Sequence, residues 1–572
     1  MRLLLYFINS FKVITLKAHQ KKAVKILFLS AIQSIADVIG LATIVPVLML
    51  AIDGDFLEKS AKLRSVYSFS GIGSEDAFFI CLILMMLLFF LIKNIYALWL
   101  QSYIKKNAAN IVAHTTRLKY RHFIQKEYQE IVSKGTPDFI NLVMNIPYHY
   151  ATGMILPFVN LCSELLIIIL FSFFAFYNPL VFIVLTVILA PAVYLINKSI
   201  KSKIVDLGIV SGHLREETLN ELNLGLNGIT EIKINRVAPY FIERFVKKQY
   251  AYAKNEMRSL TLQNVPFRVL EIVALIAVII LVVYGYFFSQ NPSEVRILGA
   301  LFVISIFRLI PAINRIMVSL MHLKIYKYTA DELLKSAVYN TTHSSPISFK
   351  NKITLQNISY TYAGSDYPIV NNLTFNIEKG SVIGLTGNSG EGKTTLVKIL
   401  LQLIKQNEGS ITVDGLKVSE KNELTWQQLI GYVGQMPYIL NGTIKENVAL
   451  GEENECNEID IIDSLKLCGL EKYANQEGLE YAVGENGIKL SEGQKQRLAM
   501  ARVVYKKNEI LILDEATSAL DDEMESLIGK TLCKLAENRI SIIIIAHRKN
   551  ILSFCDKVYV LKEGSLLERP YE

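Results

Sequence analysis

The stretch GNSGEGKTT, residues 387–395, says more about the fold of this chain than any other. It follows the apolar run Val382–Leu385 and precedes the helix-forming run Leu396–Leu403. It matches the pattern G-x-x-x-x-G-K-[ST], whose glycines let backbone N–H groups surround phosphates at a helix N-terminus. The stretch therefore predicts a P-loop domain. Its predicted nucleotide-binding residues are Gly387, Asn388, Ser389, Gly390, Glu391, Gly392, Lys393, Thr394 and Thr395.

Two of these residues have specific tasks in such a loop: Lys393 reaches the β- and γ-phosphate oxygens, and the Thr394 hydroxyl can hold Mg²⁺. A second apolar strand pattern, Ile510–Leu513, ends in Asp514 and Glu515. The carboxyl end of a strand is where P-loop folds place the aspartate that organises Mg²⁺. Glu515 can polarise an attacking water, or it can be an ordinary surface acid. We therefore expect ATP and Mg²⁺ as cofactors.

The composition divides the 572 residues into two parts. With 51% hydrophobic residues and a mean hydropathy of +0.33, the chain is too apolar for an ordinary soluble protein, yet 20% of its residues are charged. One part in lipid and one in water fits both values. Apolar runs long enough to cross about 30 Å of hydrocarbon occur six times. They are Val24–Ile52, Phe78–Tyr103, Ala151–Tyr177, Leu180–Ile200, Val265–Phe288 and Val295–Leu320.

Basic residues indicate how these spans are oriented. They gather before the first span, after the second and after the fourth, whereas acids outnumber bases between the first and second. By the positive-inside rule, both termini and the two long loops are cytoplasmic. These bases also account for the net charge of +8, so we expect no nucleic-acid partner. The six cysteines lack metal-ligand spacing and are expected to be reduced thiols, and no cleavable signal peptide is evident.

The composition turns polar after Lys324, and alternating strand patterns follow at Ile353–Tyr362 and Val370–Ile377. This change predicts an α-helical membrane domain with six transmembrane helices, followed by an α/β P-loop domain. The predicted bounds are 1–335 for the membrane domain, 336–348 for a linker and 349–572 for the nucleotide-binding domain.

The stretch LSEGQ, residues 490–494, resembles the signature motif of ABC (ATP-binding cassette) proteins. Other stretches resemble further motifs of the family in the family's order. They are Tyr362 (the adenine-stacking aromatic), Gln435 (the Q-loop glutamine), Glu485 (a contact to the membrane domain), Ser518–Asp521 (the D-loop) and His547 (the switch histidine). With six predicted spans before this domain, the whole chain is similar to a half-transporter of the ABC exporter class.

This resemblance implies a mechanism and further site residues. Two cassettes close head to tail, and Ser491, Gly493 and Gln494 of one chain face the ATP held by the other. Glu515, His547 and Gln435 are the implied catalytic residues, and Thr394, Gln435 and Asp514 are the implied Mg²⁺ ligands. Because the chain lacks none of the essential motifs, we expect a homodimer. Glu492 departs from the usual LSGGQ, but Ser491 and Gly493 are kept.

The last predicted span contains the stretch IFRLIPAINRIM, with Arg308 and Arg315 on one helical face. Lys93 and Arg268 lie in other spans, and the acids at membrane depth are Asp37, Glu164 and Glu271. Four bases outnumber three acids, so we expect an arginine without an internal partner, beside water or an anionic ligand. The alternatives are that Arg268 pairs with Glu271, or that these bases reach the membrane interface.

FRLIPAINRI and VPFRVLE resemble spans of lipid-linked oligosaccharide flippases, such as the transporter of bacterial protein N-glycosylation. The resemblance implies that Lys93, Arg268, Arg308 and Arg315 bind the anionic head group of a lipid-linked substrate. It also implies a multi-pass protein of the bacterial inner (cytoplasmic) membrane. The segment Asp55–Phe69 matches a short amphipathic helix of that group. Lys93 departs from the pattern of that group, in which an arginine is usual at this place in the second span. A lysine keeps the positive charge but lacks the planar fork of an arginine.

Two other functions remain open. One is an exporter of peptides or drug-like molecules, in which the charges serve peptide carboxylates or the structure. The other is a non-transporting ABC ATPase that acts on nucleic acid or ribosomes, against which the six predicted spans argue.

Overall fold

The computed structural model describes residues 2–52, 61–172, 179–288, 292–337, 345–452, 455–516 and 522–569. The chain divides into two compact units. The first comprises Met1–Lys126 and Ile131–Tyr339, and the second comprises Glu127–Glu130 and Asn340–Glu572. Four predicted features lie wholly or partly outside the described residues: the D-loop 518–521, the first part of the amphipathic segment, 55–60, the end of the third span, 173–177, and residues 338–344 of the linker.

The first unit is helical. Its elements are α1 (Arg2–Ile14), α2 (Lys17–Ile52), α4 (Ala61–Ser70), α5 (Glu75–Ile124), α6 (Tyr128–Ile140), η1 (Asn141–Asn145), α7 (Ile146–Tyr150), η2 (Ala151–Ile155), α8 (Leu156–Ser172), α9 (Pro179–Asn227), α10 (Ile229–Ile234), α11 (Ala238–Phe288), α12 (Pro292–Ile325) and α13 (Lys327–Ala337). The π-helical turns η1 and η2 join α6, α7 and α8 into one helical run.

Five described helices are long and apolar enough to cross a membrane: Lys17–Leu48, Glu75–Ile124, Asn141–Ser172, Ala238–Ile280 and Ser305–Lys335. They contain five of the six predicted spans at least in part. The remaining span, Leu180–Ile200, lies in the first part of α9, so a total of six spans stays a prediction. The described part of the predicted amphipathic segment belongs to α4.

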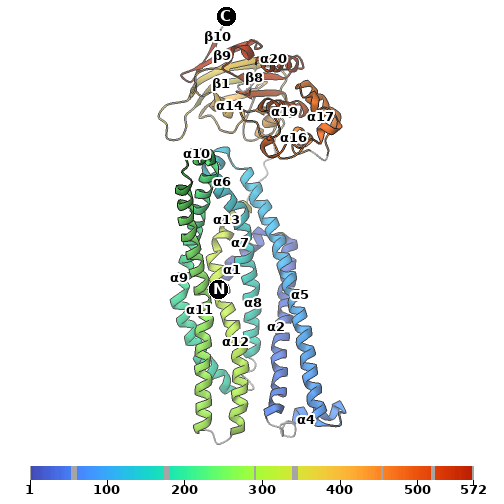
Figure 1. The fold of residues 1–572 in the computed structure, drawn as a ribbon, viewed down its shortest axis with the longest axis vertical. Helices are drawn as coiled ribbons and strands as arrows, with labels where there is room; N and C mark the ends of the chain where they lie inside the picture. The colour runs from blue at the N-terminus through green and yellow to red at the C-terminus, as the bar shows by residue number, and fades with distance from the viewer. Residues whose placement is uncertain are drawn as a thin grey trace. The chain divides into compact units, whose positions relative to one another are not determined.

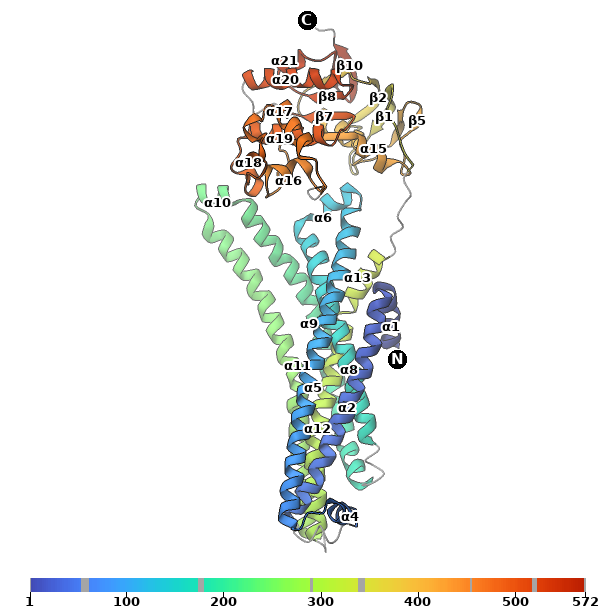
Figure 2. The same cartoon turned by 90° about the vertical axis from the view of Figure 1, so that its right-hand side faces the viewer.

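Three helices are far longer than a membrane requires. The helices α5, α9 and α11 contain 50, 49 and 51 residues, whereas about 20 residues cross the hydrocarbon. The predicted long polar loops are therefore largely helical continuations of the spans. In Figures 1 and 2, α9 and α11 run side by side, as do α2 and α5.

Two apolar clusters hold this unit together. One joins α8, α9, α11 and α12 through residues such as Phe171, Ile204, Leu270 and Phe302. The other lies around α1, α7 and η2, with Tyr150 and Met154 fully buried. Because α12 contributes to both clusters, it connects the two parts of the helical unit.

The second unit contains two sheets and the helices that cover them. Its strands are β1 (Lys352–Tyr360), β2 (Val370–Glu378), β3 (Val382–Thr386), β4 (Glu408–Val413), β5 (Leu416–Lys417), β6 (Ile430–Val433), β7 (Ile510–Asp514), β8 (Ser541–Ile545), β9 (Lys557–Lys562) and β10 (Ser565–Arg569). Its helices are α14 (Lys393–Leu400), α15 (Glu423–Leu429), α16 (Ile444–Ala449), α17 (Glu458–Leu467), η4 (Glu471–Tyr473), α18 (Gln476–Leu479), η5 (Glu485–Gly487), α19 (Glu492–Tyr505), α20 (Asp522–Glu537) and α21 (Lys549–Leu552).

The larger sheet has the strand order β10-β9-β3-β8-β7-β6. Its strands β9, β3, β8, β7 and β6 are parallel neighbours, and β10 is antiparallel to β9. The smaller sheet, β2-β1-β4-β5, is antiparallel. All five residues of β7 and all five of β8 are buried, as expected for central parallel strands.

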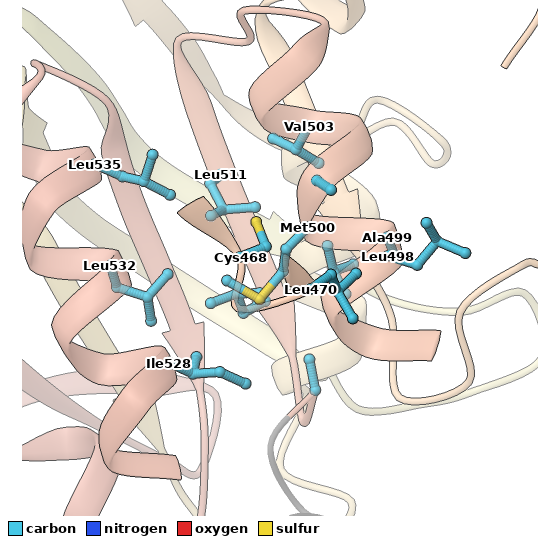
Figure 3. Close-up of a cluster of buried hydrophobic side chains, with 14 of the residues drawn as sticks. Cys468, Leu470, Leu498, Ala499, Met500, Val503, Leu511, Ile528, Leu532 and Leu535 are labelled. Atoms are coloured by element: carbon cyan, nitrogen blue, oxygen red, sulfur yellow. The ribbon is translucent and has the colours of Figure 1, made fainter. Parts of the chain in front are cut away.

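Apolar side chains fix the helices against this sheet. Figure 3 shows Leu498 and Met500 of α19 and Ile528 and Leu532 of α20 gathered around Leu511 of β7. On the other side, α14 packs with β1 and β3 in a second apolar cluster. The loops at the carboxyl ends of the parallel strands therefore start from fixed positions.

Candidate functional site

Four neighbouring parallel strands end at one edge of the larger sheet, and each leads into a predicted site residue. Gly387 follows β3, His547 lies two residues beyond β8, Glu515 follows β7, and Gln435 lies two residues beyond β6. Parallel strands present their carboxyl ends at the same edge, where α/β folds bind ligands. The sheet therefore brings together residues that lie 160 positions apart in the sequence, since Gly387 and His547 follow adjacent strands.

The phosphate loop is tightly enclosed by neighbouring backbone. Gly390 and Gly392 have φ angles of 86° and 99°, which favour glycine. A Cβ atom on Gly392 would lie 2.7 Å from the carbonyl oxygen of Ile369, and one on Gly387 would lie 2.5 Å from that of Leu561. These close approaches explain why the loop uses glycine there.

Lys393 is buried in the loop that it is expected to serve. Its Nζ donates to the carbonyl oxygens of Gly387 and Asn388, both at 2.8 Å. Glu391 accepts from the Asn388 backbone N–H at 2.8 Å and from its side-chain amide at 2.9 Å. The loop is therefore closed by its own side chains, with Lys393 directed along its inner surface.

Tyr362 lies at the side of the loop. Its hydroxyl is 3.1 Å from that of Thr395, and its ring is perpendicular to that of Tyr360 at a centroid distance of 5.0 Å. The half-exposed ring therefore stands next to the start of α14, where an aromatic side chain can stack on a base.

The acid at the end of β7 is strongly shielded from water. Asp514 is 8% exposed, and its Oδ2 accepts a hydrogen bond from the Tyr432 hydroxyl at 3.3 Å. Burial raises the pKa of Asp514, and the charge of Glu515 raises it further, whereas the Tyr432 hydrogen bond and Lys393 lower it. Burial and the charge of Asp514 raise the pKa of Tyr432 to about 12, so its hydroxyl stays a donor.

Thr394, Gln435 and Asp514 provide a hydroxyl, an amide oxygen and one carboxylate. A binding site with few carboxylates, completed by waters and phosphates, suits Mg²⁺. Asp514 in particular is a poorly solvated carboxylate that a cation would stabilise. The residues present therefore fit this ion.

Glu515 adopts a left-handed backbone conformation, with φ at 52°. Its backbone N–H donates to the Ile545 carbonyl at 3.0 Å, which ties the end of β7 to β8. Its Oε1 lies 3.3 Å from Nε2 of His547. A non-glycine residue in this region is strained, and such strain is concentrated at functional sites. The turn places a carboxylate and an imidazole together, a pair that can orient and activate water.

The LSEGQ stretch forms the N-terminus of α19. Ser491 is the N-cap: its hydroxyl accepts from the Gln494 backbone N–H at 3.3 Å, and the Gln494 side chain accepts from the Ser491 backbone N–H at 2.9 Å. This capping box leaves Ser491 exposed at the positive end of a 14-residue helix. Such a helix end can face an anion.

Comparisons with known proteins agree with this geometry. Residues 370–518 match the family model described as ABC transporter. The chain also superposes on the structure of a bacterial Atm1-family ABC exporter with ATP bound, with a TM-score of 0.77 and 20% identity, over 97% of this chain and 95% of that chain. Residues 370–518 therefore form an ABC transporter domain, and the whole chain has the fold of an ABC exporter.

Two relatives show how far the sequence similarity of this chain extends. The ATP-dependent lipid A-core flippase of Pasteurella multocida (strain Pm70) is 35% identical over 219 residues, and the match spans 38% of either protein. A putative multidrug export ATP-binding/permease protein of Bacillus subtilis (strain 168) is 26% identical over 492 residues, 83% of this chain and 82% of that protein.

In the helical unit, each of the four predicted substrate-binding bases contacts a carboxylate. Asp37 bridges two of them, with Oδ1 at 2.9 Å from Lys93 Nζ and Oδ2 at 2.9 Å from Arg308 Nη2. Arg315 Nε lies 2.6 Å from Glu164 Oε1. Arg268 Nη1 lies 2.9 Å from Glu271 Oε2, one helical turn further on.

The expectation of an arginine without an internal partner is therefore wrong. It failed because one carboxylate has two oxygens and can serve two bases. The excess of bases remains, however, since three carboxylates face four bases. The additional charge lies in the Lys93–Asp37–Arg308 cluster, whose three members are all less than one fifth exposed. Arg268, whose side chain is 73% exposed, lies outside this cluster.

Sequence reasoning missed Tyr432, which binds Asp514. It named Glu391 and Asp37 but not their contacts, namely the hydrogen bonds of Glu391 with Asn388 and the bridge of Asp37 between Lys93 and Arg308. Strand alternation in β6 could have pointed to Tyr432, because it is the exposed member of an otherwise buried strand.

Proposed function

We propose that this exporter is an ATP-driven transporter that moves a lipid-linked oligosaccharide or a similar anionic amphiphile from the cytoplasmic leaflet. In this proposal it acts as a homodimer in a bacterial inner membrane, with both termini in the cytoplasm. The Pasteurella relative is named a lipid A-core flippase, which supports a lipid-like substrate. The five membrane-length helices joined to an ABC domain support transport.

ATP hydrolysis in this proposal takes place at the edge of the larger sheet. Lys393 and the loop N–H groups hold the phosphates, and Tyr362 stacks on the adenine. Glu515 orients the water, with His547 against its carboxylate and Gln435 beside the site. Thr394, Gln435 and Asp514 would hold Mg²⁺, which offsets the charge on the phosphate oxygens when bound. Ser491, Gly493 and Gln494 complete the site of the second chain.

The observation that carries the choice of substrate is the charge of the Lys93–Asp37–Arg308 cluster. Two bases and one carboxylate give it a net charge of +1 on three helices, α2, α5 and α12. Among the described residues, Nε of Arg308 is a buried donor without a hydrogen-bond partner. A phosphate or pyrophosphate group would supply both the missing negative charge and the missing acceptor.

A second candidate is an exporter of drug-like molecules or peptides. Its support is that all four bases already have carboxylate partners, so that these ion pairs can be purely structural. The Bacillus relative, a putative multidrug export protein, also favours it.

Two substitutions separate these candidates because they change the cluster charge in opposite directions. Arg308→Ala leaves a neutral Lys93–Asp37 pair, whereas Asp37→Asn leaves two bases and a charge of +2. In reconstituted vesicles containing a pyrophosphate-linked lipid, we expect Arg308→Ala to reduce flipping strongly, and Arg308→Lys to restore only part of it because the planar fork is lost. Asp37→Asn should keep or increase the apparent affinity for the lipid.

ATP dependence is established in the same assay with Glu515→Gln. This variant should bind ATP but hydrolyse it about a hundredfold or more slowly, the usual range for loss of a general base, whereas Lys393→Ala should weaken nucleotide binding itself. Basal ATP hydrolysis should survive Arg308→Ala. If Arg308→Ala and Arg315→Ala both flip the lipid at the wild-type rate, the substrate assignment is wrong and the second candidate replaces it.

A further inference from the structure

A cavity of about 1120 Å³ lies in the helical unit between α8, α9, α12 and the start of α1. We call it the lateral groove. Its walls are mainly aliphatic, with Leu165 and Ile168 from α8 and Leu189 and Val193 from α9. The two helices that form its long sides, α8 and α9, both pack against α12.

On α12 the groove is lined by Leu309, Ile313, Ile316 and Leu320, at intervals of four, three and four residues. This spacing places them on one helical face. Lys324, four residues after Leu320, also lines the groove. The apolar face of α12 therefore ends in a base.

Two other bases line the groove or the cavity beside it. Arg2 lines the groove, and a second cavity of about 610 Å³ shares Tyr194, Asn197 and Lys324 with it and is also lined by Lys198. Asp206 is the acid in that second lining. Among the described lining residues, the two adjoining cavities therefore contain three bases and one acid, together with the polar side chains of Tyr194 and Asn197.

The lateral groove is distinct from the charged cluster in the spans. Arg308 and Arg315 directly precede Leu309 and Ile316 in the sequence, so they lie about 100° away around α12. They contact Asp37 of α2 and Glu164 of α8. Within the described part of the chain, none of the four predicted substrate-binding bases lines the groove. One helix thus separates two sites of different chemistry.

The shape and charge of the groove match one class of ligand. Long aliphatic walls accept hydrocarbon chains, and bases at one end accept a phosphate. Its volume exceeds the usual range of about 300–1000 Å³ for drug-sized ligands. Basic residues at the edge of a membrane helix are also the usual recognition site for anionic lipid head groups.

We propose that the lateral groove binds one anionic phospholipid of the surrounding membrane. Its acyl chains lie against α8, α9 and α12, and its phosphate lies at Arg2, Lys198 and Lys324. Such a lipid contacts three helices and α1 at once, so it stabilises their packing by binding the folded state. This inference does not depend on which molecule the exporter transports.

Native mass spectrometry of the full-length chain, delipidated in detergent and titrated with phosphatidylglycerol or phosphatidylcholine, tests the proposal. We expect one tightly retained phosphatidylglycerol per chain and a higher unfolding temperature when it is bound. Lys198→Ala/Lys324→Ala should weaken that binding about thirtyfold, from the usual contribution of two bases near an anionic lipid. Lys105→Ala/Lys106→Ala is the matched control, because these exposed lysines follow another span and lie outside the groove.

A third variant tests the acyl chains separately from the charge. Ala190 lines the groove and is exposed, so Ala190→Trp should fill it and displace the lipid without removing a base. Equal retention of phosphatidylcholine, equal loss in the Lys105/Lys106 control, or full binding by Ala190→Trp would each overturn the proposal. So would retention of a pyrophosphate-linked lipid in preference to phosphatidylglycerol, since the groove would then serve the transported substrate.

Discussion

The hydrogen bond from Tyr432 to Asp514 partly offsets the effect of burial on the pKa of the carboxylate at the end of β7. Burial raises the pKa of Asp514, and the Tyr432 hydroxyl opposes this rise because it stabilises the ionised form. A Mg²⁺–nucleotide complex needs that ionised form. Binding should therefore weaken as the pH falls through the raised pKa, at a higher pH than for an ordinary aspartate.

Tyr432→Phe should shift this pH dependence. Without the hydroxyl donor, the pKa of Asp514 rises further, so the midpoint of Mg²⁺–ATP binding should move to higher pH with little change well above it. Equilibrium binding of a fluorescent ATP analogue between pH 5 and 8 measures this. The control is Tyr481→Phe, which removes a hydroxyl from a tyrosine that packs against Tyr473. An unchanged midpoint in Tyr432→Phe would show that Asp514 does not govern binding.

Among the helices, the π-helical turn η2 depends on a close contact with the residue that follows α12. A Cβ atom on Gly153 would lie 2.2 Å from Cδ2 of Tyr326. The Tyr326 ring also stacks on His149 of α7, at a centroid distance of 5.3 Å. Gly153 therefore allows the run from α6 to α8 to pack closely on the end of α12.

Gly153→Ala should destabilise the helical unit by about 1–3 kcal/mol, because the added methyl overpacks a buried site. The matched control is Gly212→Ala in α9, where a Cβ atom would meet nothing within 4 Å. That change should stabilise by about 0.4–1 kcal/mol, since alanine has fewer unfolded conformations than glycine. Thermal unfolding in detergent compares the two, and equal shifts in the same direction would contradict this account of η2.

Helix ends and ion pairs were the hardest features to predict from the sequence. Hydropathy located the span Phe78–Tyr103, but α5 continues to Ile124, because an apolar window measures solubility in lipid and not the continuity of backbone hydrogen bonds. The acids Asp37, Glu164 and Glu271 were visible in the sequence. The bases with which they form ion pairs could not be predicted, except for Arg268, which is a neighbour of Glu271 on one helix.

The phosphate loop was predictable because its shape depends on the spacing of glycines and a lysine within one short, contiguous stretch of sequence. Residues 387–395 are contiguous, and the loop lies between β3 and α14 as expected, although α14 begins at Lys393, three residues before the predicted helix. Tyr432 and Asp514 lie 82 positions apart and meet only because β6 and β7 pair. Contacts of that kind depend on strand order, which local patterns do not specify.

For the whole molecule, the proposed homodimer can be tested by complementation. Lys393→Ala disables the phosphate loop. Ser491→Asp keeps an N-cap acceptor for α19 but places a negative charge where the partner's phosphates are expected. In a head-to-tail homodimer, either variant alone disables both sites. A mixed dimer has one site with both changes and one site with neither.

Co-expression of the two variants should therefore restore part of the ATPase rate that each lacks alone, and mass measurement in nanodiscs should show two copies of this chain. Absence of any recovery, with mixed dimers present by mass, would contradict the head-to-tail arrangement. Isolation of this chain only in a complex with a different half-transporter would contradict the homodimer.

The length of α5 has a mechanical consequence. Its 50 residues form one uninterrupted helix, which is about 75 Å long at 1.5 Å per residue. A tilt of about 5° around one end displaces the other end by about 6.5 Å, more than the 5.4 Å pitch of the helix. Lys93 lies 18 residues from the start of α5, and Ile124 is its last residue. The same tilt moves Lys93, about 27 Å from the pivot, by only about 2.4 Å, so a small displacement at Lys93 accompanies a movement of more than one helical turn at the distal end.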